Sequence, residues 1–128
     1  MRCLIVDDNA LFLTAARAIL DGDDLTVVGE ARNMAEAVSR ASELSPDLVL
    51  LDIDLGEESG FAVARELTAR AGEAAPKIVL VSAHPEDDFA DLIAESPALG
   101  FVAKSDLGAA TVLEIVRRGD GGSGRRPR

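Results

Sequence analysis

The sequence predicts an α/β fold in which five parallel strands form one doubly wound sheet, with five helices on its two faces. Short apolar runs alternate with segments whose apolar residues recur at helical spacing, and this unit occurs five times along the 128 residues. Strands joined by helices in this way are parallel, with right-handed crossovers. The expected strand order is 2-1-3-4-5, a common arrangement for such a sheet.

The third apolar run is the clearest strand of the chain. Leu48–Asp52 reads Leu-Val-Leu-Leu-Asp, and it lies between a turn at Pro46-Asp47 and a loop that contains Gly56. An apolar run without a polar interruption is typical of a strand buried on both faces of a parallel sheet. Asp52 is therefore expected at the carboxyl end of a strand, the edge where such sheets hold their ligands.

Two strand–helix units precede this strand, and in both helices the apolar residues repeat every three or four positions. Their expected elements are a strand Cys3–Val6, a helix Ala10–Leu20 capped by Asn9, a strand Leu25–Val28 and a helix capped by Asn33 that ends at Leu44.

The second half of the chain continues the alternation. Its expected elements are a helix from Ser59 to near Gly72, a strand Lys77–Ser82, a short acidic helix from Pro85, a strand Leu99–Ala103 and a helix Leu107–Arg118 capped by Ser105-Asp106. We expect residues 1–118 to form one domain. Residues 119–128, which are rich in Gly, Ser and Arg, are expected to be a disordered tail.

Composition narrows the class of protein. The formal net charge of −10 argues against direct binding of nucleic acid by this domain, because phosphate contacts need a basic face. The single cysteine, Cys3, leaves no internal disulfide and fits a reducing compartment. No apolar run approaches the length of a membrane span, and the first run is too short for a signal peptide. We therefore expect a cytoplasmic protein that does not contact the membrane.

Polar side chains end four of the predicted strands. They are Asp7-Asp8 after the first strand, Asp52 on the third, Ser82 on the fourth and Lys104 after the fifth. Parallel strands end at one edge, and the first and third strands are expected to be neighbours, so three carboxylates meet there. Carboxylates that lie this close together repel one another unless a cation lies between them. Mg²⁺ suits a site of a few carboxylates, a carbonyl and a phosphate oxygen.

The same set of residues is sufficient for phosphoryl transfer. Asp52 can act as a nucleophile and form an aspartyl phosphate. Lys104 supplies a positive charge to a phosphate oxygen, and the Ser82 hydroxyl can donate a hydrogen bond to another. Phosphoryl transfer requires little more of a protein than an aligned nucleophile and neutralisation of charge.

These residues stand in motifs that resemble the receiver domain of response regulators in two-component signalling, over residues 2 to about 118. The matching motifs are Val6-Asp7-Asp8-Asn9, Leu50-Leu-Asp52-Ile-Asp54-Leu, Gly60, Val81-Ser82-Ala83 and Phe101-Val-Ala-Lys104. Val27-Val-Gly-Glu-Ala31 and Lys104-Ser105 are most similar to receivers that precede a helix-turn-helix output domain. The resemblance implies a flavodoxin-like sheet.

The resemblance also implies how the acidic residues divide their roles. Asp52 corresponds to the phosphoacceptor, and Asp7 and Asp8 correspond to the pair that places Mg²⁺. The backbone carbonyl of Asp54 corresponds to the third protein ligand of the metal.

The remaining motif residues correspond to the switch. Ser82 resembles the hydroxyl that follows the phosphoryl group, Lys104 its ionic partner, and Phe101 the aromatic residue whose rotamer reports the state. Asp54 and His84 occupy the positions at which this family tunes the lifetime of the phosphoryl group.

The implied function is a signalling switch with slow self-dephosphorylation, not a metabolic enzyme. The implied partners are a histidine kinase or histidine phosphotransfer protein and a downstream protein or output domain, with a homodimer as a further form. Phosphorylation is expected to shift the face formed by the fourth helix, fifth strand and fifth helix. The sequence does not choose between a stand-alone receiver and part of a longer regulator.

Two departures from the family pattern lie in the loop after the phosphoacceptor. Gly56 stands where Pro is usual, and Ser59 stands where Asp is frequent. A glycine here is expected to loosen the loop.

Two other classes of protein share part of this pattern. Asp52-Ile-Asp54 resembles the nucleophile motif of haloacid-dehalogenase-type phosphatases, but there the acidic pair follows the motif, whereas Asp7-Asp8 precedes it here. A pseudo-receiver, a binding module of the same fold that takes no phosphate, is disfavoured by the intact set of site residues but remains the alternative.

Overall fold

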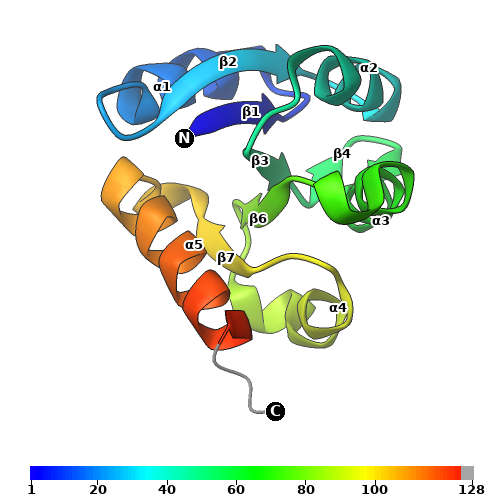
Figure 1. Cartoon of the computed structure of the whole chain (residues 1–128). Coiled ribbons are helices and arrows are strands. Elements are labelled where there is room, and N and C mark those ends of the chain that lie inside the picture. Colours follow the sequence, from blue (N-terminus) through cyan, green and yellow to red (C-terminus); the bar gives the residue numbers. More distant parts are fainter. Residues whose placement is uncertain (125–128) are drawn as a thin grey trace.

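The computed structural model describes residues 1–124, and the side chains of residues 1–119. Five parallel strands form one sheet in the order β2-β1-β3-β6-β7, so the predicted fold and strand order are confirmed (Figure 1). The strands are β1 Arg2–Val6, β2 Thr26–Ala31, β3 Leu48–Asp52, β6 Lys77–Ser82 and β7 Gly100–Ala103.

Helices cover both faces of this sheet: α1 and α5 lie on one face, and α2, α3 and α4 lie on the other (Figure 1). The helices are α1 Ala10–Leu20, α2 Met34–Leu44, α3 Gly60–Ala71, α4 Ala90–Glu95 and α5 Ala109–Gly124. Short 3₁₀ turns occupy Gly72–Ala74, Glu86–Phe89 and Lys104–Asp106. Within residues 1–124, no helix has the length and apolar character needed to cross a membrane.

The strand β3 shows how one sequence builds both halves of the core. Leu48 and Leu50 pack in the cluster beneath α1 and α5, whereas Val49 and Leu51 pack in the cluster beneath α2 and α3. Successive side chains of a strand point to opposite faces, and both faces of this sheet are covered, so every position of β3 must be buried.

The strand β2 is longer than the sequence indicated, and its predicted range Leu25–Val28 was wrong at both ends. Residues Gly29–Ala31 pair with Leu4–Val6 after a register shift between Cys3 and Leu4. The sequence Gly-Glu-Ala looked like the end of the strand because Gly and Glu are poor strand formers. The pairing with β1 nevertheless extends the strand to Ala31.

The helix α5 differs from its predicted range at both ends. Residues Lys104–Asp106 form a 3₁₀ turn, so the α-helix begins at Ala109, not Leu107, and it continues past Arg118 to Gly124. A Cβ at Gly119 would lie 2.9 Å from Cδ2 of Leu99, so a glycine allows the helix to pass close to that side chain. Residues 125–128 lie outside the described residues, and the domain boundary at residue 118 stays a prediction.

A small antiparallel hairpin after β3 was not predicted. Its strands are β4 Asp54–Leu55 and β5 Glu58–Ser59, with Gly56 and Glu57 as a two-residue turn. The φ angle of Gly56 is +74°, which a proline, fixed near −65°, cannot adopt. The carboxylate of Glu58 accepts a hydrogen bond from the backbone N–H of Met34 at 2.8 Å. Gly56 therefore gives this turn a backbone conformation that the usual proline could not adopt. The predicted loosening of the loop stays a prediction.

The strand β2 is an edge of the sheet, and side chains of the chain itself cover its outer backbone groups. Arg17 Nη1 donates to the carbonyl of Val27 at 3.2 Å, and Arg40 Nε donates to the carbonyl of Glu30 at 3.4 Å. The carboxylate of Asp21 accepts from the N–H of Val27 at 2.9 Å.

Gly60, the first residue of α3, is the position where the fold leaves least room for a side chain. A Cβ there would overlap the backbone oxygen of Asp52 and lie 2.7 Å from the Cα of Ile53. We expect Gly60→Ala to lower the free energy of unfolding by about 3 kcal/mol, because the obstructing atoms are backbone. Urea unfolding measures the change. Gly22→Ala is the matched control, since a Cβ there meets nothing within 4 Å; equal stability of the two variants would contradict this view of the strand–helix junction.

Candidate functional site

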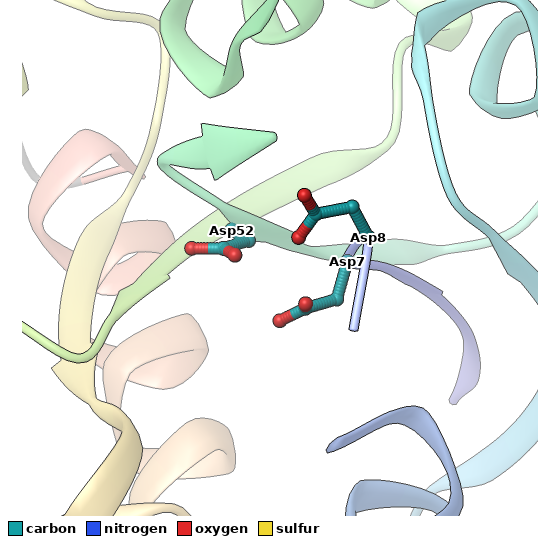
Figure 2. Close-up of side chains that lie close together, drawn as sticks. All are labelled: Asp7, Asp8 and Asp52. Atoms are coloured by element: carbon teal, nitrogen blue, oxygen red, sulfur yellow. The ribbon is translucent and has the colours of Figure 1, made fainter. Parts of the chain in front are cut away.

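Three carboxylates lie together where β1 and β3 end. Asp7 and Asp8 follow β1, Asp52 is the last residue of β3, and each offers an oxygen within 4.8 Å of the others (Figure 2). The register that pairs Val6 with Leu51 brings the residues that follow them side by side. Asp7 and Asp52 are only 0% and 5% exposed, so two of the three negative charges are buried.

The ammonium group of Lys104 reaches this cluster from the end of β7. Its Nζ lies 2.8 Å from Oδ2 of Asp7 and 3.4 Å from Oδ2 of Asp52. Oδ1 of Asp7 accepts a hydrogen bond from the N–H of Asn9 at 2.8 Å, but Oδ2 of Asp7 is buried without a well-aligned hydrogen bond. One ammonium thus faces two buried carboxylates, and one buried oxygen is left with an ion pair alone.

Burial and the neighbouring charge change the acidity of Asp52. Burial, together with the nearby carboxylate of Asp7, raises the pKa of Asp52 from an ordinary value of 3.8 to about 7. The N–H of Asp54, which donates to Oδ1 of Asp52 at 3.2 Å, and the ammonium of Lys104 act in the opposite direction. Burial alone would lower the pKa of Lys104, but its contacts with Asp7 and Asp52 outweigh burial and raise it.

A cavity of about 220 Å³ opens over the cluster. Its lining combines acids, a cation, a hydroxyl and backbone: Asp8, Asn9, Asp52, Asp54, Gly56, Ser82, Ala83, His84 and Lys104. Ser82 is 1% exposed, and its Oγ accepts a hydrogen bond from the N–H of His84 at 3.0 Å. Two larger hollows lie between α2 and α3 and beside β2. Chemistry, not size, marks the smaller cavity as the site, because the buried carboxylate of Asp52 lines it together with Ser82 and Lys104.

The donor set fits a hard divalent cation such as Mg²⁺. Three carboxylates offer oxygen ligands, and Asp54 lines the same cavity. Oδ2 of Asp7, which has an ion pair with Lys104 but no well-aligned hydrogen bond, would gain a second partner. A cation would also relieve the repulsion between Asp7 and Asp52. The residues that could hold it are therefore Asp7, Asp8, Asp52 and the backbone carbonyl of Asp54.

The structure brings together most of the residues predicted from the sequence. Asp7, Asp8, Asp52, Ser82 and Lys104 meet at one edge of the sheet, and Asp54 and His84 line the cavity that they form. Phe101 does not line this cavity: it pairs in register with Leu80 and packs, half-buried, against the core cluster beneath α2 and α3.

One residue of the site was not singled out in the sequence. The Nζ of Lys104 lies 4.2 Å from the centre of the Phe12 ring, in the first turn of α1. The sequence placed Phe12 in the apolar stripe of a helix, and it does pack against the core. The apolar pattern of the helix gave no sign that this ring lies beside the ammonium of Lys104.

The chain matches the family described as response regulator receiver domain over residues 3–116. Response regulator GacA of Pseudomonas viridiflava is 33% identical over 118 residues, which make up 91% of this chain and 54% of that protein. A protein-glutamate methylesterase/protein-glutamine glutaminase of Symbiobacterium thermophilum is 33% identical over 121 residues, 91% of this chain and 32% of that protein. The chain thus spans about half, or less, of these relatives.

Solved structures agree with this match. A two-component response regulator of the LuxR family from Aurantimonas sp. SI85-9A1 superposes with a TM-score of 0.79 at 30% identity, covering 94% of this chain and 85% of that one. The signal receiver domain of NarL from Mycobacterium tuberculosis gives a TM-score of 0.78 at 27% identity, covering 94% and 96%. The fold, the acidic cluster and the family match lead to one conclusion: the chain belongs to the response regulator receiver domains of two-component systems.

Proposed function

We propose that this domain is a phosphoacceptor switch in which Asp52 takes a phosphoryl group from a histidine kinase or a histidine phosphotransfer protein. One observation carries the proposal: Asp52 is buried beside Asp7 and Asp8, with the ammonium of Lys104 at 3.4 Å, on the floor of an open cavity. Phosphorylation and Mg²⁺ binding are features of the receiver family. These two family features support the proposal that the acidic cluster binds Mg²⁺ and that Asp52 accepts the phosphoryl group.

In the proposed reaction, one carboxylate oxygen of Asp52 attacks the phosphorus atom of a phosphohistidine. The new O–P bond forms as the P–N bond breaks, and the ring nitrogen of the donor keeps the electron pair. The N–H of Asp54 fixes Oδ1 of Asp52, which orients the carboxylate toward the cavity. When bound by Asp7, Asp8, Asp52 and the carbonyl of Asp54, Mg²⁺ supplies positive charge to the transferred oxygens.

Lys104 and Ser82 have distinct tasks in this proposal. The ammonium of Lys104 already faces Oδ2 of Asp52 and would pair with an oxygen of the phosphoryl group once it is attached. The hydroxyl of Ser82 lines the same cavity and would turn toward another of these oxygens, after which the ring of Phe101 moves inward. These changes would shift the face formed by α4, β7 and α5, where a partner reads the state.

The lifetime of the phosphoryl group is the second property that we propose for this site. Asp54 and His84 line the same cavity as Asp52 and Ser82, where they would control the approach of water. Slow self-dephosphorylation would then reset the switch. The domain would thus assist its own phosphoryl transfer and hydrolysis while serving signalling, not metabolism.

The partners and setting of the domain are likewise proposals. Because the chain spans about half of response regulator GacA, we propose that such a receiver controls an output domain or a separate protein, alone or as a homodimer. The acidic composition supports a role without direct contact to nucleic acid or membrane. The single cysteine, Cys3, supports a setting in the reducing cytoplasm. A pseudo-receiver that binds partners without phosphate is the competing function.

The first test is phosphorylation by acetyl phosphate, followed by intact-mass analysis. Wild-type protein is expected to gain one phosphoryl group only with Mg²⁺, and Asp52→Asn is expected to gain none, because the amide oxygen is a poor nucleophile. Asp23→Asn, in an exposed loop, is the matched control and should behave as wild type. Labelling of Asp52→Asn at another residue would refute the assignment of Asp52, and an unlabelled wild type would favour the pseudo-receiver.

Removal of Asp8 tests the metal site. Asp8→Ala is expected to weaken Mg²⁺ binding by roughly tenfold, because the variant loses an exposed carboxylate that has an oxygen within 4.8 Å of oxygens on Asp7 and Asp52. Isothermal titration calorimetry measures the affinity, with Asp23→Ala as the control. Unchanged affinity would show that Asp8 is not a ligand.

The raised pKa of Asp52 predicts how stability depends on pH without metal. The folded protein keeps the proton on Asp52 up to about pH 7, whereas the unfolded chain releases it near pH 4. The contribution of this group to the free energy of unfolding is therefore complete below pH 4. It is lost as the pH rises through 7. The free energy of unfolding of Asp52→Asn minus that of wild type should therefore rise by up to about 1 kcal/mol per pH unit between pH 5 and 7. Urea unfolding in a chelator measures it; a difference independent of pH would contradict the raised pKa.

A further inference from the structure

The ammonium of Lys104 has three neighbours of two different kinds. Two are the buried carboxylates of Asp7 and Asp52, at 2.8 and 3.4 Å, and the third is the aromatic ring of Phe12, whose centre lies 4.2 Å from Nζ. A cation within about 6 Å of a ring centre is attracted to the negative charge on the ring face. Phe12 therefore contributes to holding Lys104 without carrying a charge itself.

The start of α1 fixes the ring where the ammonium can meet it. Oδ1 of Asn9 caps the helix by accepting hydrogen bonds from the N–H groups of Leu11 and Phe12, at 2.9 and 3.2 Å. The N–H of Asn9 in turn donates to Asp7. One short segment thus sets both a carboxylate and the ring that face Lys104, and the packing of Phe12 against the core limits its movement.

The two kinds of neighbour respond differently to the proposed reaction. Asp7 and Asp52 would share their charge with Mg²⁺, and Asp52 would lose its charge on becoming an aspartyl phosphate, so both would attract the ammonium less. The ring of Phe12 ligates no metal and carries no exchangeable group, so its attraction persists. Because a ring face is less directional than a hydrogen bond, the ammonium can move toward a phosphoryl oxygen without leaving it.

We propose that Phe12 is a positioning residue that keeps the ammonium of Lys104 over the site while its carboxylate partners change. The inference rests on the proposed function of Asp52 for its effect on phosphorylation, but the ring contact itself can be measured without any phosphoryl transfer. The two can therefore fail separately.

The contact is tested by nuclear magnetic resonance on protein labelled with ¹³C-lysine. The chain has only two lysines, so two sets of ε-methylene signals appear, and Lys77→Arg assigns them. The protons beside Nζ of Lys104 should be shifted upfield by the ring current in wild type and in Phe12→Tyr, which keeps the ring. Phe12→Leu should remove the shift. A wild-type Lys104 signal that does not change in Phe12→Leu would overturn the proposed contact.

The functional effect is tested by the rate of Mg²⁺-dependent phosphorylation by acetyl phosphate. Phe12→Leu should slow it about fivefold, equivalent to ~1 kcal/mol, while Phe12→Tyr stays within about twofold of wild type. Mg²⁺ affinity should not fall in Phe12→Leu, because the ring is not a ligand. Loss of affinity and rate together would indicate a general structural role and overturn positioning.

A fluorine series separates the charge of the ring face from its size. Phenylalanine with one, two or three fluorine atoms, incorporated at position 12 alone, should slow phosphorylation stepwise, because fluorine withdraws electrons from the ring with little change in volume. Phe61, a buried ring that packs near Phe89 in the other core cluster, is the matched control position. Equal rates across the series at position 12 would overturn the inference. If wild type takes no phosphate at all, the proposed function fails, and the lysine signals still decide whether the ring holds Lys104.

Discussion

Repulsion between two buried carboxylates is the interaction on which this domain depends. Asp7 and Asp52 lie at the ends of neighbouring strands, where water cannot separate their charges, and a single ammonium serves both. Burial and this repulsion together bring the pKa of Asp52 to about 7. A site with such an excess of negative charge gains from any cation that enters it. In the proposed function, metal, proton and phosphoryl group would therefore be coupled at Asp52.

The sheet explains how so unfavourable an arrangement is maintained. The strand β3 is buried at every position, and its neighbours β1 and β6 hold its end in register from both sides. Gly60 brings the start of α3 against the backbone of Asp52, so the backbone that carries this carboxylate is held on that side as well. The free energy gained by burying the apolar core on both faces of the sheet offsets the cost of burying the charges.

Much of the sheet and of the acidic site could be predicted from the sequence, because a strand and the polar residue that ends it are recognised within a few neighbouring residues. An apolar run such as Leu48–Asp52 indicates both that the strand is buried and which residue ends it. Because the strands are parallel, their terminal residues lie at the same edge of the sheet. The extension of β2 to Ala31 could not be predicted, since it depends on a register shift opposite Cys3. Nor could the contact between Phe12 and Lys104, because the apolar pattern of a helix does not tell which ring lies beside a charge from a distant strand.

The covered edge of β2 restricts how this domain can assemble. Arg17, Arg40 and Asp21 occupy outer backbone groups that an added strand would need for its own hydrogen bonds. A second chain that extended the sheet at this edge would first have to displace two guanidinium groups and a carboxylate. Strand addition at this edge therefore carries the cost of breaking these three hydrogen bonds, so growth of the sheet from β2 is disfavoured.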